Sequence, residues 1–368
     1  MEAPSMAMDF AMFYEIPVPK PWNDSSEHEA YKNTIEEAVL GEQAGFESFW
    51  TVEHHFLDEY SHCSEPSPLY GAIAALTSTM RIGYGVRLCP WPYNHPIRSA
   101  EAAAVLDLVS DGRVEFGTGR SATRAELEGF GVDPHKTRDQ WQEAIRMVVG
   151  AWTEETFEWQ GETWQVPPRH VHPKPLQKPH PPIWGASSSE PSHVIAGEMG
   201  IGLLSFTIGL PPEELSNRIA LYRDALTRAK PVGKVSNERA ATFTMVHCAD
   251  SDEQAFQEAA ESFEWYLRIA LYHIGTVADM MEGKPLGTYD YAKMVRDLDL
   301  KDLSFDYLQS SGSTIVGSPQ RCAEVASRYD EADCDTLFCL LNPYKIPHKS
   351  VMRSIELLGE HVIPQFKA

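Results

Sequence analysis

Short apolar runs alternate with segments of helical periodicity along most of the chain, as strands do when helices cover them. The predicted strands are residues 8–16, 49–52, 81–88, 113–119, 182–187, 201–206, 241–249 and 336–341. The predicted helices are residues 28–43, 68–79, 97–110, 138–152, 192–199, 213–229, 251–275, 320–329 and 348–361. Because each strand is followed by a helix, the pattern predicts parallel βαβ units.

The number of strands favours an α/β fold of the closed (β/α)8 type, a TIM barrel, over a doubly wound open sheet. Two insertions are predicted within one barrel domain that spans residues 1–368. Residues 153–181 are rich in Trp and Pro and contain FEWQGETWQV, a predicted hairpin that turns at Gln160–Gly161. Residues 276–311 are predicted to be irregular. In such a barrel, ligands and reacting groups gather at the carboxyl ends of the strands.

Net charge narrows the possible partners of this 368-residue chain. Lys and Arg number 31 against 53 Asp and Glu, which gives a formal net charge of -22. A chain this acidic repels phosphate backbones and anionic lipid, so we expect neither nucleic acid nor a membrane as partner. No apolar run has the length of a membrane span, the start lacks a signal-peptide pattern, and the six cysteines show no C-x-x-C spacing. We therefore expect a cytoplasmic protein with free thiols.

Three titratable residues, Glu53, His54 and His55, stand at the end of the second predicted strand. Side chains alternate along a strand, so the two histidines can face the same way only if the strand has already ended. The H-E-x-x-H spacing of a helical zinc site is absent, and we expect no metal. Two interpretations remain. The residues form either a hydrogen-bonded buried pair or a proton-transfer site. In the second case His54 transfers the proton, His55 supports His54, and Glu53 orients His54.

A possible anion-binding turn, GTGRSA, follows the fourth strand at residues 117–122. Its glycines allow close backbone approach, and Arg120 offers a forked cation to a phosphate. The letters also fit the dinucleotide pattern G-x-G-x-x-A, with Asp139 near the acidic offset. That fingerprint usually opens a fold, whereas three βα units precede it here, so we favour the phosphate interpretation. A tight turn with a solvated Arg is the alternative.

Two further segments have the composition of a ligand site. GASSSEPSHVIAGEMG at 185–200 places serines at a predicted helix start, where hydroxyls and free amides bind an anion or simply cap the helix. Its candidate ligands are Ser188, Ser189 and Ser192. In YGVRLCPWPYNHPIR at 84–98, Gly85 would let a flat ring approach the third strand, unless the segment is only a rigid connector. Aromatic residues that could line an apolar pocket, or belong to the core, are Trp50, Trp91, Tyr93, Phe206 and Trp265.

Taken in order, these segments resemble the bacterial luciferase-like family of flavin-dependent monooxygenases. The matching segments are EHHF at 53–56, IGYGV at 82–86, NHPIRSAE at 94–101, SDGRVEFGTGRS at 110–121, GASSSEPSHVIAGEMGIGLLSF at 185–206 and GSPQRCAEVASRY at 317–329. The likeness covers most of the chain and omits the insertion at 276–311. It implies a (β/α)8 barrel, in agreement with the count of strands.

The resemblance implies reduced FMN as cosubstrate, molecular oxygen as oxidant and a C4a-peroxyflavin that oxygenates a small apolar organic substrate. A separate flavin reductase would supply the reduced FMN, since no dinucleotide domain is evident, and family members suggest a homodimer. Two other functions stay open: hydride transfer with a deazaflavin, and flavin binding without catalysis. Gly119 stands where light-emitting luciferase has a reactive cysteine, and Ser188 where it has an acidic residue, so light emission is not implied.

The resemblance also assigns roles to individual residues. His54 falls on the histidine that assists as a base, and Gly85–Val86 on a backbone segment, often cis, beneath the flavin ring. Arg120 falls on the arginine that contacts the FMN phosphate, and Arg138 on a second arginine at the start of the next helix. The serine-rich cap falls on Ser188, Ser189 and Ser192.

Overall fold

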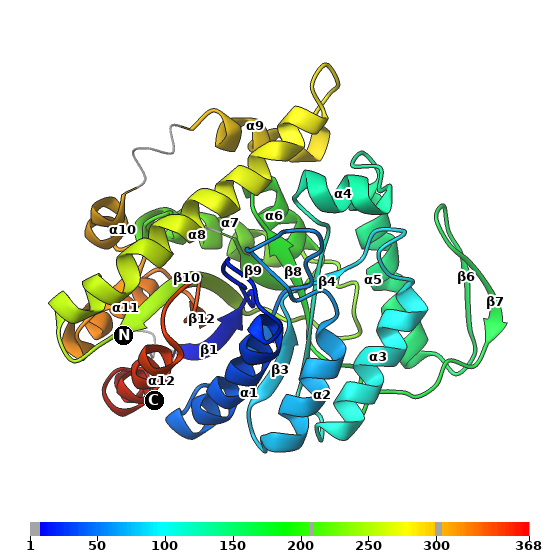
Figure 1. Cartoon of the computed structure of the whole chain (residues 1–368). Coiled ribbons are helices and arrows are strands. Elements are labelled where there is room, and N and C mark those ends of the chain that lie inside the picture. The colour runs from blue at the N-terminus through cyan, green and yellow to red at the C-terminus, as the bar shows by residue number, and fades with distance from the viewer. Residues whose placement is uncertain (1–7, 207–208, 299–303, 368) are drawn as a thin grey trace.

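A computed structural model describes residues 8–206, 209–298 and 304–367, and within them eight parallel strands close into a barrel at the centre of the molecule (Figure 1). The barrel strands are β1 (Asp9–Tyr14), β2 (Ser48–Thr51), β3 (Arg81–Tyr84), β5 (Val114–Gly119), β8 (Ile183–Ser187), β9 (Gly202–Ser205), β10 (Ala240–Cys248) and β12 (Thr336–Leu340). Each strand pairs with the next in this order, and β12 pairs with β1 to close the ring. All eight overlap the predicted strands, so the predicted TIM barrel is confirmed.

Helices surround the barrel on its outer side (Figure 1). They are α1 (Ser26–Ala44), α2 (Pro66–Leu76), α3 (Pro96–Val109), α4 (Arg124–Phe130), α5 (Thr137–Thr153), α6 (Glu190–Glu198), α7 (Pro212–Leu226), α8 (Asp252–Met280), α11 (Pro319–Glu331) and α12 (His348–Leu357), which continues into η3 (Leu358–Val362) and η4 (Ile363–Gln365). Helix α4 is absent from the sequence prediction because its seven residues are too few to show an apolar period. Its start is set by Thr123, whose side chain accepts a hydrogen bond from the Glu126 amide.

The two predicted insertions have different structures. In the first, β6 (Phe157–Gln160) and β7 (Gln165–Arg169) form an antiparallel hairpin that projects from the barrel (Figure 1). In the second, α8 extends to Met280, and η1 (Gly287–Tyr289), α9 (Asp290–Arg296) and α10 (Phe305–Ser311) follow. The prediction that residues 276–311 are irregular is therefore wrong for much of the described part, while 299–303 lie outside it.

Large side chains fill the inside of the barrel. The Trp50 ring lies with its centroid 4.7 Å from that of Phe338 and 5.7 Å from that of Trp184. Gly83 makes room for it, because a Cβ atom at Gly83 would lie 2.0 Å from Trp50 Cδ2. This packing makes Trp50 a core residue. Because side chains fill the barrel interior, we expect a ligand site beyond them, at the carboxyl ends of the strands.

Two short strands, β4 (Arg87–Leu88) and β11 (Ile315–Gly317), pair with barrel strands without joining the ring. The predicted third strand is interrupted by a cis peptide at Gly85–Val86, after which β4 pairs with the end of β5. Strand β11 pairs with β10 beyond the ring. None of the helices in the described residues is long and apolar enough to cross a membrane. All six cysteines are buried and free.

Candidate active site

A cavity opens at the carboxyl ends of the barrel strands, with an empty volume of about 1390 Å³ that is partly open to solvent. Part of its wall is apolar and comes from strands on opposite sides of the barrel and from α8. These residues are Phe13, Val52, Leu204, Phe206, Phe243, Ile274 and Phe338. Two polar groups complete the lining: carboxylates around His54, and two arginines near a row of serines.

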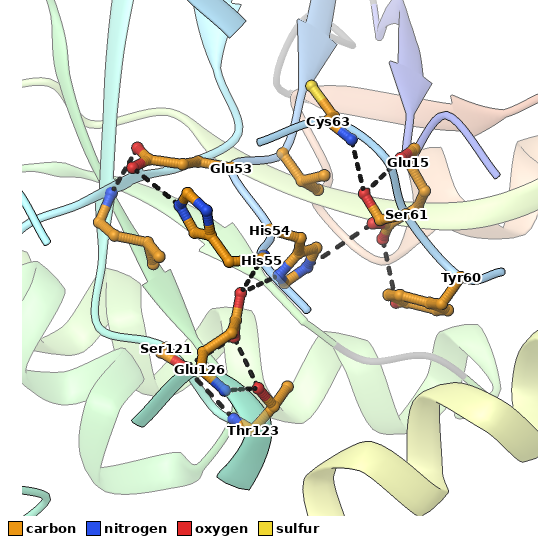
Figure 2. A network of polar contacts seen from close by, with 12 residues as sticks. Glu15, Glu53, His54, His55, Tyr60, Ser61, Cys63, Ser121, Thr123 and Glu126 are labelled. Atoms are coloured by element: carbon orange, nitrogen blue, oxygen red, sulfur yellow. Dashed lines mark hydrogen bonds and ion pairs between the residues drawn. The ribbon is translucent and has the colours of Figure 1, made fainter. Parts of the chain in front are cut away.

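His54 lies just beyond β2, which ends at Thr51, so the strict alternation of side chains no longer applies to it. Its Nδ1 is 2.8 Å from Oε1 of Glu126, and its Nε2 is 3.6 Å from Oε2 of Glu15 (Figure 2). Both carboxylates are buried, and Figure 2 shows His54 between them. The histidine thus stands at the cavity wall with an acidic group near each ring nitrogen.

Glu126 is the partner of His54 that the sequence prediction missed. It lies in the first turn of α4, and its Oε2 accepts hydrogen bonds of 2.7 Å from the hydroxyls of Ser121 and Thr123. Its Oε1 also accepts the backbone N–H of His55 at 3.0 Å. The signal for this residue is the T-x-x-E spacing from Thr123 to Glu126, which marks a capped helix start.

Glu53 does not orient His54, contrary to the sequence prediction. Its Oε1 accepts a 2.7 Å hydrogen bond from Asn94 Nδ2, and its Oε2 accepts the Leu88 amide at 3.2 Å. Arg87 Nη1 lies 3.4 Å from the same Oε2. The physical reason is that hydrogen bonds and a cation from the segment after β3 hold both Glu53 oxygens there. Glu53 therefore holds that segment in place.

His55 packs against aromatic rings outside the cavity lining. Its ring centroid lies 4.8 Å from that of Phe130 and 6.4 Å from that of Tyr93. Its Nε2 is 3.6 Å from Glu53 Oε1. None of these contacts is with His54, and a supporting role for His55 stays a prediction.

The carboxylates change the proton affinity of the histidine. Burial lowers the pKa of His54, but the charge and hydrogen bond of Glu126, together with the charge of Glu15, outweigh burial and raise the pKa to about 9. The pKa of His273, on α8, falls to about 4 because of burial and the nearby positive charge of His54. Burial raises the pKa of Glu15, while burial is outweighed at Glu126, where the His54 charge and the hydrogen bonds lower the pKa.

Two arginines form the cationic side of the cavity. Arg120 follows β5, and its Nη1 donates to the Thr137 hydroxyl at 3.1 Å and to the Thr288 hydroxyl at 2.7 Å. Its guanidinium carbon lies 4.9 Å from the centroid of the Tyr289 ring. Burial and the charge of Arg120 lower the pKa of Arg138, in the first turn of α5. Neither arginine forms an ion pair with a carboxylate among the described residues. The part of the cavity that they line, the arginine corner, therefore has two cations that could bind an anion.

The three predicted serines all line the same cavity at the start of α6. Ser189 and Ser192 form a capping box, in which the Ser189 amide donates to Ser192 Oγ at 3.0 Å. The helix-capping role is therefore present, and the same residues also face the cavity. Tyr291 of α9, in the second insertion, joins this wall and was not among the predicted site residues.

The cis peptide Gly85–Val86 forms another part of the cavity lining. Space beside it is tight, since a Cβ atom at Gly85 would lie 3.1 Å from Phe13 Cε2 and 3.2 Å from the Thr51 carbonyl oxygen. At Gly119, a Cβ atom would lie 2.3 Å from Val86 Cγ2. The close packing thus leaves no room for a side chain at Gly119.

Of the five aromatic residues predicted to line the pocket, four lie outside the cavity lining. Phe206 lines the cavity. Trp50 lies in the barrel interior, Tyr93 packs on Phe130 with ring centroids 4.9 Å apart, and Trp91 is 51% exposed. Trp265 stacks on Tyr344 with centroids 3.7 Å apart, on the outer part of α8. Residue type indicates an apolar contact but not its face, so these four assignments to the pocket are corrected.

Comparisons with known proteins agree with this geometry. The family described as luciferase-like monooxygenase matches residues 8–336. The oxygenase component of a flavin-dependent trigonelline monooxygenase from Acinetobacter baylyi is 28% identical over 263 residues, 70% of each chain. The alkanal monooxygenase alpha chain of Photobacterium leiognathi is 27% identical over 351 residues, 93% of this chain and 95% of the relative.

Solved structures show the same fold. The oxygenating constituent of 3,6-diketocamphane monooxygenase from Pseudomonas putida, a type II Baeyer–Villiger monooxygenase in complex with FMN, superposes with a TM-score of 0.78 at 23% identity. The superposition covers 98% of this chain and 99% of that one. With the family match spanning most of the sequence, the predicted resemblance is confirmed, and the chain belongs to the luciferase-like monooxygenase family.

Proposed function

We propose that this protein is the oxygenase component of a two-component system, which uses reduced FMN and molecular oxygen to oxygenate a small apolar organic molecule. The observation that carries the proposal is the pair Arg120 and Arg138. Two cations without a carboxylate partner among the described residues face one cavity in a chain of net charge -22. Such a corner fits a phosphate group, because arginine forks bind phosphate oxygens through charge-assisted hydrogen bonds.

The rest of the cavity fits the other parts of FMN. Ser188, at the start of α6, adds hydrogen-bonding groups beside the arginine corner. The Gly85–Val86 peptide offers a wall without a bulky side chain at Gly85, which suits a flat ring. His54 stands on the same cavity with its Nδ1 held by Glu126, which leaves Nε2 as the ring atom for a bound ligand.

The apolar wall has a separate role in this proposal. Reduced FMN, when bound, supplies the electrons with which molecular oxygen is activated. Phe206, Phe243 and Phe338 would hold an apolar substrate there and keep water away from the reacting oxygen. We expect the substrate to be an aldehyde, a ketone or a terpene-like molecule, and a separate reductase to deliver the flavin. The name of the Acinetobacter relative, an oxygenase component, supports that division of labour.

Oxygen labelling tests the proposal. The protein is supplied with FMN, NADH, a generic flavin reductase and ¹⁸O-labelled oxygen, and a panel of apolar aldehydes, ketones and terpenes is screened by mass spectrometry. We expect one labelled oxygen atom in a product that is absent without the protein. Arg124→Ala serves as a matched control, because Arg124 is an exposed arginine paired with Glu128 and lies outside the cavity lining.

Cofactor binding separates this function from the deazaflavin alternative. A solved relative by fold is an F420-dependent secondary alcohol dehydrogenase, with a TM-score of 0.72 at 18% identity. Dissociation constants for reduced FMN and for reduced F420 are measured without oxygen. Tight binding of F420 with no binding of FMN would contradict the proposal, as would the absence of label from every product.

A further inference from the structure

Glu15 is a buried acid in the cavity lining that no prediction or comparison assigned to the site. It follows β1 directly and is 1% exposed. Its Oε1 accepts hydrogen bonds from the hydroxyls of Tyr266 at 2.8 Å and Tyr60 at 3.1 Å. Its Oε2 has no hydrogen-bond partner and lies 3.6 Å from His54 Nε2, which is longer than a hydrogen bond. The free oxygen therefore faces His54 across a short gap.

Glu126 occupies the opposite side of the same ring. Its 2.8 Å contact with His54 Nδ1 is a hydrogen bond, and its remaining acceptor sites are satisfied by Ser121, Thr123 and the His55 amide. A neutral imidazole has one N–H and can donate to one carboxylate only. A protonated imidazole has two, and it also supplies the positive charge that buried carboxylates require.

Other charged groups around His54 do not supply that charge. Glu53 is a third acid, and the nearby Arg87 lies against it, 3.4 Å away. His273 of α8 faces the same region, but burial and the His54 charge bring its pKa to about 4, so it is neutral at pH 7. Tyr60 and Tyr266 donate hydrogen bonds to Glu15 and carry no positive charge, and the His55 ring lies against Glu53.

Another buried histidine, with a single carboxylate partner, serves as a comparison for His54. His247 on β10 is also buried and also lies 2.8 Å from a carboxylate, Glu258 of α8. With this single partner, burial prevails and the pKa of His247 is lowered. His54 differs by having carboxylates near both nitrogens, and its pKa is raised to about 9 although burial opposes it.

We propose that Glu15 and Glu126 hold His54 as a cation at neutral pH. Because Nε2 lies beyond hydrogen-bond distance from Glu15, its N–H stays available to a ligand in the cavity, where a neutral ring would present a lone pair. What a cationic His54 would do in catalysis rests on the proposed function. In that setting His54 is a hydrogen-bond donor that stabilises negative charge on a bound ligand, whereas the family resemblance implies a base. Glu15 and Glu126 are positioning residues in this arrangement, because they act through His54.

Histidine titration by NMR tests this without any cofactor. The full chain is labelled at histidine Cε1, and the His54 signal is identified by its loss in His54→Gln. In the wild type we expect half-protonation at least one pH unit above the usual value of about 6.5. Glu126→Gln should reduce the proton affinity at least tenfold, and Glu15→Gln should reduce it by a smaller factor. Glu126→Asp keeps the charge and should restore most of the affinity.

Glu258→Gln is the matched control, because it removes the single carboxylate of another buried histidine. It should move the signal of His247 and leave that of His54 in place. Thermal unfolding checks that each variant is folded, and if Glu126→Gln fails to fold, Glu126→Asp and Glu15→Gln carry the test. The inference is overturned if wild-type His54 is neutral at pH 7. It is also overturned if neither Glu126→Gln nor Glu15→Gln changes the titration of His54. FMN binding measured on the same samples reports separately on the proposed function.

Discussion

Replacing Arg120 by alanine should weaken the binding of FMN but not that of riboflavin. The two flavins share the ring system, and riboflavin lacks the phosphate. In the structure Arg120 is already held by the hydroxyls of Thr137 and Thr288, at 3.1 and 2.7 Å, and lies over the ring of Tyr289. Little side-chain entropy is then lost on binding, so the interaction with a phosphate should keep most of its strength.

The expected size follows from the kind of bond. A hydrogen bond to a charged group contributes roughly 1.5–3 kcal/mol, which corresponds to roughly a 10- to 150-fold increase in the dissociation constant for FMN. For riboflavin we expect a change of less than about twofold, since no phosphate contact is lost. Arg120→Lys keeps the charge without the fork, so its effect on FMN should be intermediate.

Binding is measured by equilibrium dialysis of the reduced flavins without oxygen. The exposed Arg124, which pairs with Glu128, provides the matched control as Arg124→Ala. Its FMN affinity should equal that of the wild type. If Arg120→Ala weakens both flavins equally, the arginine acts on the shape of the cavity instead of on the phosphate. If FMN affinity is unchanged, the assignment of the phosphate corner is refuted.

Three further predictions follow from the same structure. Thr288→Val removes the 2.7 Å contact to Arg120 and should weaken FMN binding by about 1 kcal/mol, or roughly fivefold, in the same dialysis assay; an effect larger than that of Arg120→Ala would contradict this order. The pKa of His54 is raised from an ordinary 6.5 to about 9, so its stabilising contribution is full below pH 6.5 and is lost as the pH rises through 9. Urea unfolding should show a loss of up to about 3 kcal/mol across that window, and His54→Gln should remove that part of the slope. Gly83→Ala places a Cβ atom 2.0 Å from Trp50 and should lower the free energy of unfolding by about 1–3 kcal/mol. Gly71→Ala, whose Cβ atom would have nothing within 4 Å, should raise that free energy by up to about 1 kcal/mol. Equal melting temperatures for the two variants would refute the packing argument.

Much of the fold follows from local pattern. Each of the eight barrel strands is a short apolar run between helical segments, and the order of such runs restricts the topology to a few parallel arrangements. The helices within 276–311 could not be predicted from the sequence, because η1 and α9 are short and their helical period is weak. The same holds for α4, which carries Glu126.

The candidate site divides in the same way. His54, Arg120 and the serines could be predicted because strand ends and helix starts are recognisable from neighbouring residues, whereas Arg138 came from the family resemblance; all of them line the cavity. The aromatic lining could not be predicted, because a tryptophan in an apolar run looks alike whether it faces the core, as Trp50 does, or the solvent, as Trp91 does. Phe206, directly after β9, lines the cavity, and its sequence pattern did not distinguish it from the other aromatic candidates.

The partners of His54 show where local reasoning ends. Glu53 is its neighbour in sequence, yet the Glu53 carboxylate binds Asn94 and lies against Arg87. Glu126, 72 residues away along the chain, and Glu15, at the end of β1, reach His54 only because closing the barrel brings β1, β2 and α4 to one mouth. Residue types and their order are properties of the chain that specify the barrel and its histidine. Which carboxylate meets that histidine, and so which charge it carries, is decided by long-range contacts that form when the barrel closes.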